Sequence, residues 1–460
     1  VDWARNRAPA LLPDFGRASE TACRALKEYE SFLSEKVRPR AHGEFAVGRE
    51  MFEFLLRESH GLSSSASDLE AFGRKEIEET LRKLRETAAE MGSAGGWEER
   101  VEACRKEIPD PDRLLPVYRD EIARARQFLL DRDLFTFPPG EVLHVVETPV
   151  FERKTTPFAA YVPPAPFEPE QEGHFWVTPP SLKGQRRMQA HALPGIPITS
   201  VHEGYPGHHL QISLANRTAS RVRRQFGTPV MVEGWALYCE ELMGEEGFYT
   251  DPRTRLFQLK DYLWRSCRVV IDVGMHTKAL SPGEAIRMLV EVSKLDPGGA
   301  AGEVGRYSKT PTQPLSYAAG KREVLRLRED LRKVEGPAFS LRRFHDRFLQ
   351  FGSIPISRIR DRLHADLSVR SLFEAPTVAG LARRIAGDLL QELEVLDVPR
   401  PDLQHVGHRC RRGRPDVCRR AAGAHRRGSP TGARGAPCPG RETDPRPLPA
   451  DADRRRGRRA

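Results

Sequence analysis

The chain has 460 residues, of which 39% are hydrophobic and 30% are charged, and its formal net charge at pH 7 is +10. This composition is typical of a globular protein long enough for two or three domains. No apolar run approaches the roughly 18 to 20 residues that a spanning helix needs, so we predict no membrane span. The seven Cys residues form no CxxC pair, which argues against a zinc ribbon and a disulfide framework.

The positive charge is confined to one segment. Residues 401–460 contain 16 Arg and six acidic residues, whereas the first 400 residues contain 58 basic and 58 acidic residues. Only this Arg-rich end has a charge excess that attracts nucleic acid, so nucleic-acid binding is the weakest functional hypothesis. The chain begins with Val and shows no signal peptide, which suggests an incomplete N-terminus and leaves a cytoplasmic or an exported location open.

Apolar residues at three- and four-residue spacing predict helices along most of the chain. The expected helices are 18–36, 68–92, 98–107, 116–132, 198–216 with a Pro-Gly interruption, 229–244, 252–280, 282–295, 314–335 and 339–351. Short β-prone segments at 141–150, 158–162 and 174–178 predict a small sheet. We therefore expect a mainly α fold with a small sheet just before residue 198.

The character of the sequence changes near residue 365. After about residue 396 the chain consists largely of Arg, Pro, Gly and Ala and contains no aromatic residue. Such a segment cannot bury enough apolar surface to offset the entropy of the chain. We predict a domain over 1–364, a short helical segment over 365–390 and a disordered tail over 391–460.

The most informative motif is His-Glu-Gly-Tyr-Pro-Gly-His-His at 202–209, followed by Glu233 on an apolar helix. Zinc hydrolysis requires three protein ligands, one open coordination position and a carboxylate that takes a proton from water. Histidines of the motif and Glu233 would be the ligands, and Glu203 would be the proton acceptor. The pattern predicts a zinc-dependent hydrolase.

The second imidazole ligand is left open by the spacing. The usual motif places two His four residues apart, but that position here is Pro206. His208 and His209 follow His202 by six and seven residues, and seven residues of straight helix span about 10.5 Å. We therefore expect Pro206 and Gly207 to bend the helix, so that His202 and either His208 or His209 bind zinc.

Other polar residues are weaker candidates. Tyr317, His276 and Arg306 have the right chemistry to stabilise the negative charge that forms on a carbonyl oxygen, although core packing or salt bridging explains each equally well. Glu240 and Glu241 are expected on the solvated face of their helix, with a role in supporting a metal ligand as the alternative for either. The strand at 174–178 is a candidate for aligning an extended peptide by edge pairing.

The stretch 199–211, together with Val-Glu-Gly-Trp-Ala-Leu-Tyr at 232–238, resembles the bacterial domain-of-unknown-function family numbered eight-eight-five, which is grouped with the zincin metallopeptidases. The likeness covers roughly residues 15–360. It implies a largely helical zincin-like fold with a deep cleft beside the small sheet, similar to the helical carboxypeptidases and oligopeptidases. Alignment with the Gly-His of those relatives favours His208 as the second ligand, with Glu233 as the third ligand and Glu203 as the general base.

Residues 361–386 resemble the C-terminal half of a peptidyl carrier domain from modular synthetases. The motif whose serine carries the phosphopantetheine arm is incomplete, because only Phe-Gly-Ser at 351–353 lies nearby. The resemblance implies a fusion remnant and a synthetase or carrier partner. We therefore expect a zinc-dependent, metallopeptidase-like enzyme acting on a peptide or small amide. The alternative is a non-catalytic helical scaffold or interaction module of a peptide-synthetase system.

Overall fold

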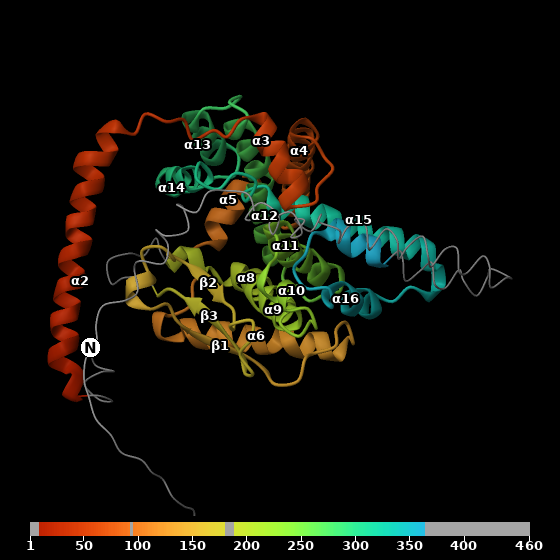
Figure 1. Cartoon of the computed structure of the whole chain (residues 1–460). Coiled ribbons are helices and arrows are strands. Elements are labelled where there is room, and N and C mark those ends of the chain that lie inside the picture. The colour runs from red at the N-terminus through yellow and green to blue at the C-terminus, as the bar shows by residue number, and fades with distance from the viewer. Residues whose placement is uncertain (1–8, 93–94, 180–187, 364–460) are drawn as a thin grey trace, which may run out of the picture. The chain divides into compact units, whose positions relative to one another are not determined.

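The computed structural model describes residues 9–92, 95–179 and 188–363 (Figure 1). Helix predominates and the sheet is small, which confirms the mainly α fold. The α-helices are α2 (Leu12–Phe32), α3 (Arg49–Phe54), α4 (Ala66–Glu90), α5 (Gly96–Cys104), α6 (Leu114–Asp131), α8 (Ile196–Glu203), α9 (His208–Ala215), α10 (Arg221–Gln225), α11 (Pro229–Glu245), α12 (Pro252–His276), α13 (Pro282–Glu291), α14 (Pro297–Tyr307), α15 (Ser316–Glu335) and α16 (Leu341–Leu349). The strands are β1 (Glu141–Glu147), β2 (Ala159–Val162) and β3 (Gln171–Val177).

The observed elements follow the predicted ones closely, with three additions. The helices α3, α10 and α14 were not predicted. The first two are only six and five residues long, and α14 is rich in glycine and alanine, so none offers a strong apolar stripe. The predicted segments 365–390 and 391–460 lie outside the described residues, and so does nearly all of the carrier-like stretch.

The N-termini of α11 and α12 are fixed by local capping. Thr228 accepts a hydrogen bond from the backbone N–H of Val230, and Pro229 occupies the first turn of α11. Asp251 accepts a hydrogen bond at 2.9 Å from the backbone N–H of Arg253 at the start of α12. These caps satisfy N–H groups that a helix end leaves unpaired. Because α11 carries Glu233 and Glu240, and α12 carries Arg268, these fixed starts also set the register of those side chains.

The sheet has the strand order β1-β3-β2, with β1 parallel and β2 antiparallel to β3. The strand predicted at 174–178 therefore corresponds to the central strand, whose backbone groups pair with both neighbours. A central strand has no free edge, so the prediction that this strand binds a peptide by edge pairing was wrong. Both edge strands contact the motif: the backbone N–H of Tyr161 on β2 donates to Glu203, and Glu141 on β1 is bonded to His209.

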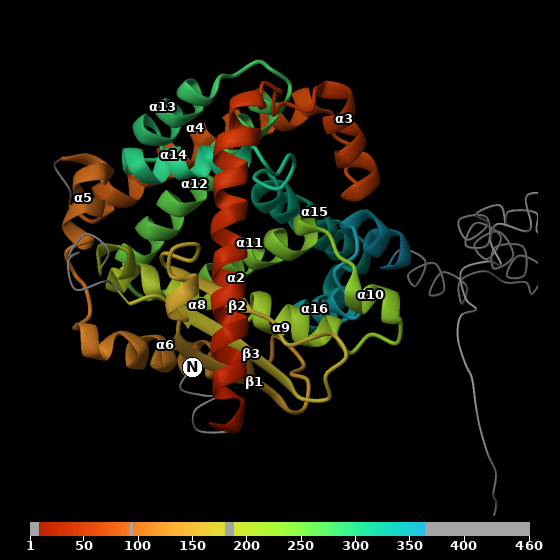
Figure 2. The same cartoon turned by 60° about the vertical axis from the view of Figure 1, so that its left-hand side comes forward.

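The helix α8 packs between α6 on the side of the sheet and α11 on the other side. Figures 1 and 2 show this order, with α12 beyond α11. Buried apolar side chains form two clusters, one around the sheet, α6, α11 and α15, and one around α4, α5, α12, α13 and α14. Both clusters include residues of α12, so this helix joins the two halves of the core.

The helices α11 and α15 cross where two glycines meet. A Cβ atom on Gly320 would overlap the carbonyl oxygen of Val230 and the Cα of Gly234, and a Cβ on Gly234 would overlap the backbone of Gly320. Only glycine permits this backbone approach. The contact fixes the distance between the helix that carries Glu233 and the helix that carries Tyr317.

We predict that Gly320→Ala lowers the free energy of unfolding by about 1–3 kcal/mol, because the added methyl group must force α11 and α15 apart. Gly305→Ala in α14 is the matched control, since nothing lies within 4 Å of a Cβ at that position. Alanine is the better helix former, so the control should gain up to about 1 kcal/mol. Urea titration of both variants measures the difference. Equal effects would contradict the proposed crossing.

Candidate metal centre

The turn between α8 and α9 brings the two ends of the motif together. The helix α8 ends at Glu203 and α9 begins at His208, with a cis peptide bond between Tyr205 and Pro206. The backbone N–H of Gly207 donates to the carbonyl of Val201 at 3.0 Å, so the chain folds back onto the last turn of α8. A Cβ on Gly207 would overlap the carbonyl oxygens of Val201 and His202, so this approach requires glycine.

The indole of Trp235 on α11 holds the same turn from the other side. Its Nε1–H donates to the carbonyl of Pro206 at 2.9 Å, and the whole side chain is buried. The turn is thereby attached to the helix that carries Glu233, two residues earlier. The expected interruption at Pro206 and Gly207 is thus a complete break between two helices.

This arrangement places His202, His208 and Glu233 around one point. Their ligand atoms all lie within 4.8 Å of one another. Glu233 Oε2 is 3.7 Å from His202 Nε2 and 3.4 Å from His208 Nε2. Both histidines are buried. Two imidazoles and one carboxylate are a donor set that suits zinc and leaves a fourth position open.

His202 is oriented by a second carboxylate. Its Nδ1 is 2.8 Å from Glu240 Oε1, and Glu240 is only 1% exposed. The expectation that Glu240 lies on a solvated face was wrong, whereas Glu241 is partly exposed and pairs with Lys321. Burial alone would lower the pKa of His202, but hydrogen bonds to Glu233 and Glu240 raise it to about 10.

The partners of Glu233 keep its charge. Burial favours the neutral acid, but hydrogen bonds from the imidazoles of His202 and His208 outweigh burial and lower the pKa of this carboxyl. In the absence of metal the three side chains therefore lie together as ion-pair contacts. A metal ion at this point would displace the proton from Nε2 of His202, so its binding would release protons.

His209 points away from this cluster. Its Nε2 is 2.7 Å from Glu141 Oε2 on β1, and its Nδ1 is 3.1 Å from the hydroxyl of Tyr161 on β2. The side chain is fully buried between the sheet and α9. The structure therefore brings His208, and not His209, to His202 and Glu233.

Glu203 follows His202 at the end of α8. Its Oε2 accepts a hydrogen bond at 3.0 Å from the backbone N–H of Tyr161 on β2. The carboxylate is thus fixed between the edge of the sheet and the cluster, and its negative charge helps to raise the pKa of His202. A carboxylate in this position can accept a proton from a water molecule bound at the cluster.

Tyr317 at the start of α15 also reaches the cluster. Its ring stacks on that of His202, with centroids 6.3 Å apart and an angle of 17° between the planes. The guanidinium carbon of Arg268 lies 4.8 Å from the centroid of the Tyr317 ring. Burial and the charge of Glu233 raise the pKa of Tyr317 to about 12, so the phenol stays protonated and can donate a hydrogen bond.

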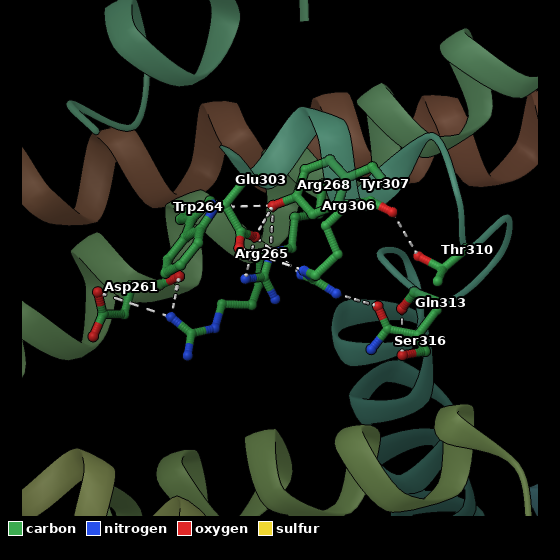
Figure 3. A network of polar contacts seen from close by, with 10 residues as sticks. All are labelled: Asp261, Trp264, Arg265, Arg268, Glu303, Arg306, Tyr307, Thr310, Gln313 and Ser316. Atoms are coloured by element: carbon green, nitrogen blue, oxygen red, sulfur yellow. Dashed lines mark hydrogen bonds and ion pairs between the residues drawn. The ribbon is translucent and has the colours of Figure 1, made fainter. Parts of the chain in front are cut away.

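The other two candidates have different surroundings. Arg306 donates to Glu303 at 2.9 Å and to the side chain of Gln313 at 2.8 Å, as Figure 3 shows. His276 is fully buried, and its Nε2 is 3.0 Å from the carbonyl of Tyr307. The rings of Phe45 and Phe52 lie against it. The described contacts of His276 therefore belong to the core and not to the cluster.

Sequence reasoning gave Glu240 only as a lesser alternative, and it missed two other groups that support the cluster, Arg268 and the backbone N–H of Tyr161. A signal existed for Glu240, because seven residues from Glu233 place it on the same face of α11. The roles of Arg268 and Tyr161 depend on contacts between distant segments and had no such local signal.

Comparisons with known proteins agree with this fold. The family described as "Bacterial protein of unknown function (DUF885)" matches residues 2–363. A "putative lipoprotein of unknown function" from Shewanella oneidensis has a TM-score of 0.66 and 24% identity, over 75% of this chain and 65% of that chain. A "putative lipoprotein" from Colwellia psychrerythraea has a TM-score of 0.65 and 26% identity, over 74% of this chain and 59% of that chain.

Two further findings complete the comparisons. The chain spans less than two thirds of the length of both solved structures. No curated protein matches the chain.

Among the described residues, no helix combines the length and the apolar character that crossing a bilayer requires.

We predict that His208→Ala abolishes stoichiometric zinc binding, whereas His209→Gln keeps about one zinc ion per chain. The first change removes a donor of the cluster, and the second removes a side chain bonded to Glu141 instead. Metal analysis after dialysis against limiting zinc, with circular dichroism to verify folding, distinguishes the two adjacent histidines. Loss of zinc from a folded His209→Gln variant but not from His208→Ala would reverse the assignment.

Proposed function

For this chain, which belongs to the bacterial family of unknown function DUF885, we propose the function of a zinc-dependent, zincin-like hydrolase that cleaves amide bonds in peptides. The observation that carries the proposal is the convergence of His202, His208 and Glu233 within 4.8 Å, with Glu203 adjacent to the first ligand in sequence. Such a donor set leaves one position for water or substrate. A zinc ion bound there would lower the pKa of water and polarise a carbonyl group.

Three side chains of this chain would transfer protons, stabilise the carbonyl oxygen and orient a ligand. Glu203 would accept the proton of the attacking water and later give a proton to the leaving amine. Tyr317 would donate a hydrogen bond to the carbonyl oxygen as it gains negative charge. Glu240 would keep Nδ1 of His202 protonated, so that Nε2 remains free as a ligand atom.

The edge strand β2 is suited to align an extended peptide. The carbonyl of Phe158 accepts a hydrogen bond at 2.8 Å from the N–H of Thr178 and so points toward β3. Backbone groups alternate in direction along a strand, so those of Ala159 and Tyr161 point away from β3. The N–H of Tyr161 points that way, since it donates to Glu203. A peptide paired along this edge would pass beside the proposed base.

The descriptions of the two solved structures as lipoproteins support a location outside the cytoplasm for this chain as well. The scaffold alternative has no comparable support, because the carrier-like stretch lies almost entirely outside the described residues.

We predict that Glu203→Gln reduces peptide hydrolysis at least about 1,000-fold while one zinc ion stays bound, because the amide cannot accept the proton of water. Glu172→Gln is the control, since that carboxylate is exposed on β3 and pairs with His144. Digestion of a peptide library followed by mass spectrometry, with metal analysis of each variant, provides both readouts. Unchanged turnover by Glu203→Gln would refute the proposed role.

We predict that Tyr317→Phe lowers kcat by about 10²–10³-fold with little change in KM, because the phenol would act only on the charge that develops in the transition state. The ring that stacks on His202 is retained in this variant, so the metal cluster should stay intact. Steady-state kinetics on a peptide cleaved by the wild-type chain tests this separation. A change confined to KM would show that Tyr317 binds substrate instead.

A further inference from the structure

Beside Tyr317, the helices α12 and α14 present a cluster of arginines. Arg265 and Arg268 lie on one face of α12, because they follow Asp261 by four and seven residues. The facing side of α14 contributes Arg306 and Glu303. Figure 3 shows the guanidinium groups of Arg268 and Arg306 beside the carboxylate of Glu303, and the guanidinium group of Arg265 beside Asp261.

The anions near these arginines are too few to balance their charge. Arg268 and Arg306 share the same oxygen of Glu303, at 3.1 and 2.9 Å. The hydroxyl of Tyr307 also donates to that oxygen, at 2.7 Å. One carboxylate therefore serves two guanidinium groups, of which that of Arg268 is buried and that of Arg306 is partly exposed.

The third guanidinium shares its anion as well. Asp261 is 2.8 Å from Lys260 Nζ and 3.8 Å from Arg265 Nη1. Across the cluster, four cations thus face two carboxylates. Lys260, Arg265 and Arg268 are each no more than 15% exposed, so screening of their charges by water and salt is weak.

Arg265 has the most unused hydrogen-bonding capacity of the three. A guanidinium has five N–H donors, and Nη1 of Arg265 donates to the carbonyl of Asp261 at 3.3 Å. Its Nε is buried and has no hydrogen-bond partner among the described residues. A buried donor without a partner costs free energy, so an acceptor from a ligand would be stabilised there.

The cluster adjoins the proposed catalytic centre. Arg268 lies against the ring of Tyr317, and that ring stacks on His202. Burial and Glu233 raise the pKa of Tyr317, whereas Arg268, Arg265 and Arg306 act electrostatically in the opposite direction. All three guanidinium groups are therefore within electrostatic range of the phenol. An anionic group held by them would lie close to a carbonyl placed at the metal.

We infer that Arg265, together with Arg268 and Arg306, binds a carboxylate of the substrate, and that the substrates are peptides with a free C-terminal carboxylate close to the cleaved bond. Arginine suits this task, because its planar fork matches the two oxygens of a carboxylate. The inference rests on the proposed hydrolase function. It implies that the enzyme cleaves peptides near their C-terminus, whereas cleavage in the middle of a peptide would need no such arginine cluster.

The test compares two peptides of one sequence, N-acetylated and alanine-rich, one with a free C-terminal carboxylate and one with a C-terminal amide. Their binding to zinc-loaded Glu203→Gln protein is measured by calorimetry, so that no cleavage occurs. We expect the acid to bind at least tenfold more tightly than the amide. Equal binding, or no binding of either peptide, would overturn the inference without the need for any arginine variant.

Additional substitutions in the Glu203→Gln protein identify which arginine causes the preference for the acid. Arg265→Gln in the same background should reduce the preference for the acid to less than about twofold. Arg326→Gln on α15, whose guanidinium is exposed and pairs with Glu323, should leave the preference unchanged. Thermal melting verifies that both variants fold. A preference that persists in folded Arg265→Gln protein would reject the role of Arg265.

A third peptide, amidated but ending in Asp, separates the two sources of a carboxylate. Tight binding of this peptide would contradict the restriction to the C-terminus and assign the cluster to an acidic side chain. The proposed function is tested independently, because it fails if the wild-type chain with zinc cleaves no peptide. The binding preference can persist in that case, so the two failures are distinguishable.

Discussion

The candidate site depends on one turn of four residues. Between α8 and α9 the chain folds back so tightly that Gly207 lies against the carbonyl groups of Val201 and His202. Without this reversal, six helical residues would separate His202 and His208 by about 9 Å along a helix axis. With it, Nε2 of His202 and Nε2 of His208 lie 3.7 and 3.4 Å from the same oxygen of Glu233. The geometry of a metal centre thus follows from a glycine that no side chain can replace.

Two further contacts extend this local geometry into the surrounding helices. Glu240 is hydrogen-bonded to Nδ1 of His202. The same face of α11 therefore carries both a proposed ligand, Glu233, and the residue that orients His202. The close approach of Gly234 and Gly320 sets α15 against α11, and Tyr317 reaches His202 as a result. Four helices that are separate in sequence are therefore held in register around a single point. Such support by rigid elements is what precise metal coordination requires.

Sequence patterns predicted most of the helices, because their apolar stripes recur at helical spacing. The motif also indicated that His202, His208 and Glu233 lie together, as they do in the structure. Spacing alone could not choose between His208 and His209, since the choice depends on the direction in which the chain leaves the turn. Glu240 was misplaced because a Glu-Glu pair is typical of a solvated face. Arg265 and Arg268 belong to no local motif, and their shared environment arises only when α14 packs against α12.

The central claim is that His202, His208 and Glu233 bind one metal ion, and crystals of the chain soaked in zinc test it most directly. Anomalous diffraction recorded on both sides of the zinc absorption edge should show one peak, about 2.0–2.2 Å from Nε2 of both imidazoles and from the carboxylate of Glu233. A fully soaked crystal with no peak between these three side chains, or with its zinc beside His209 and Glu141, would contradict the account.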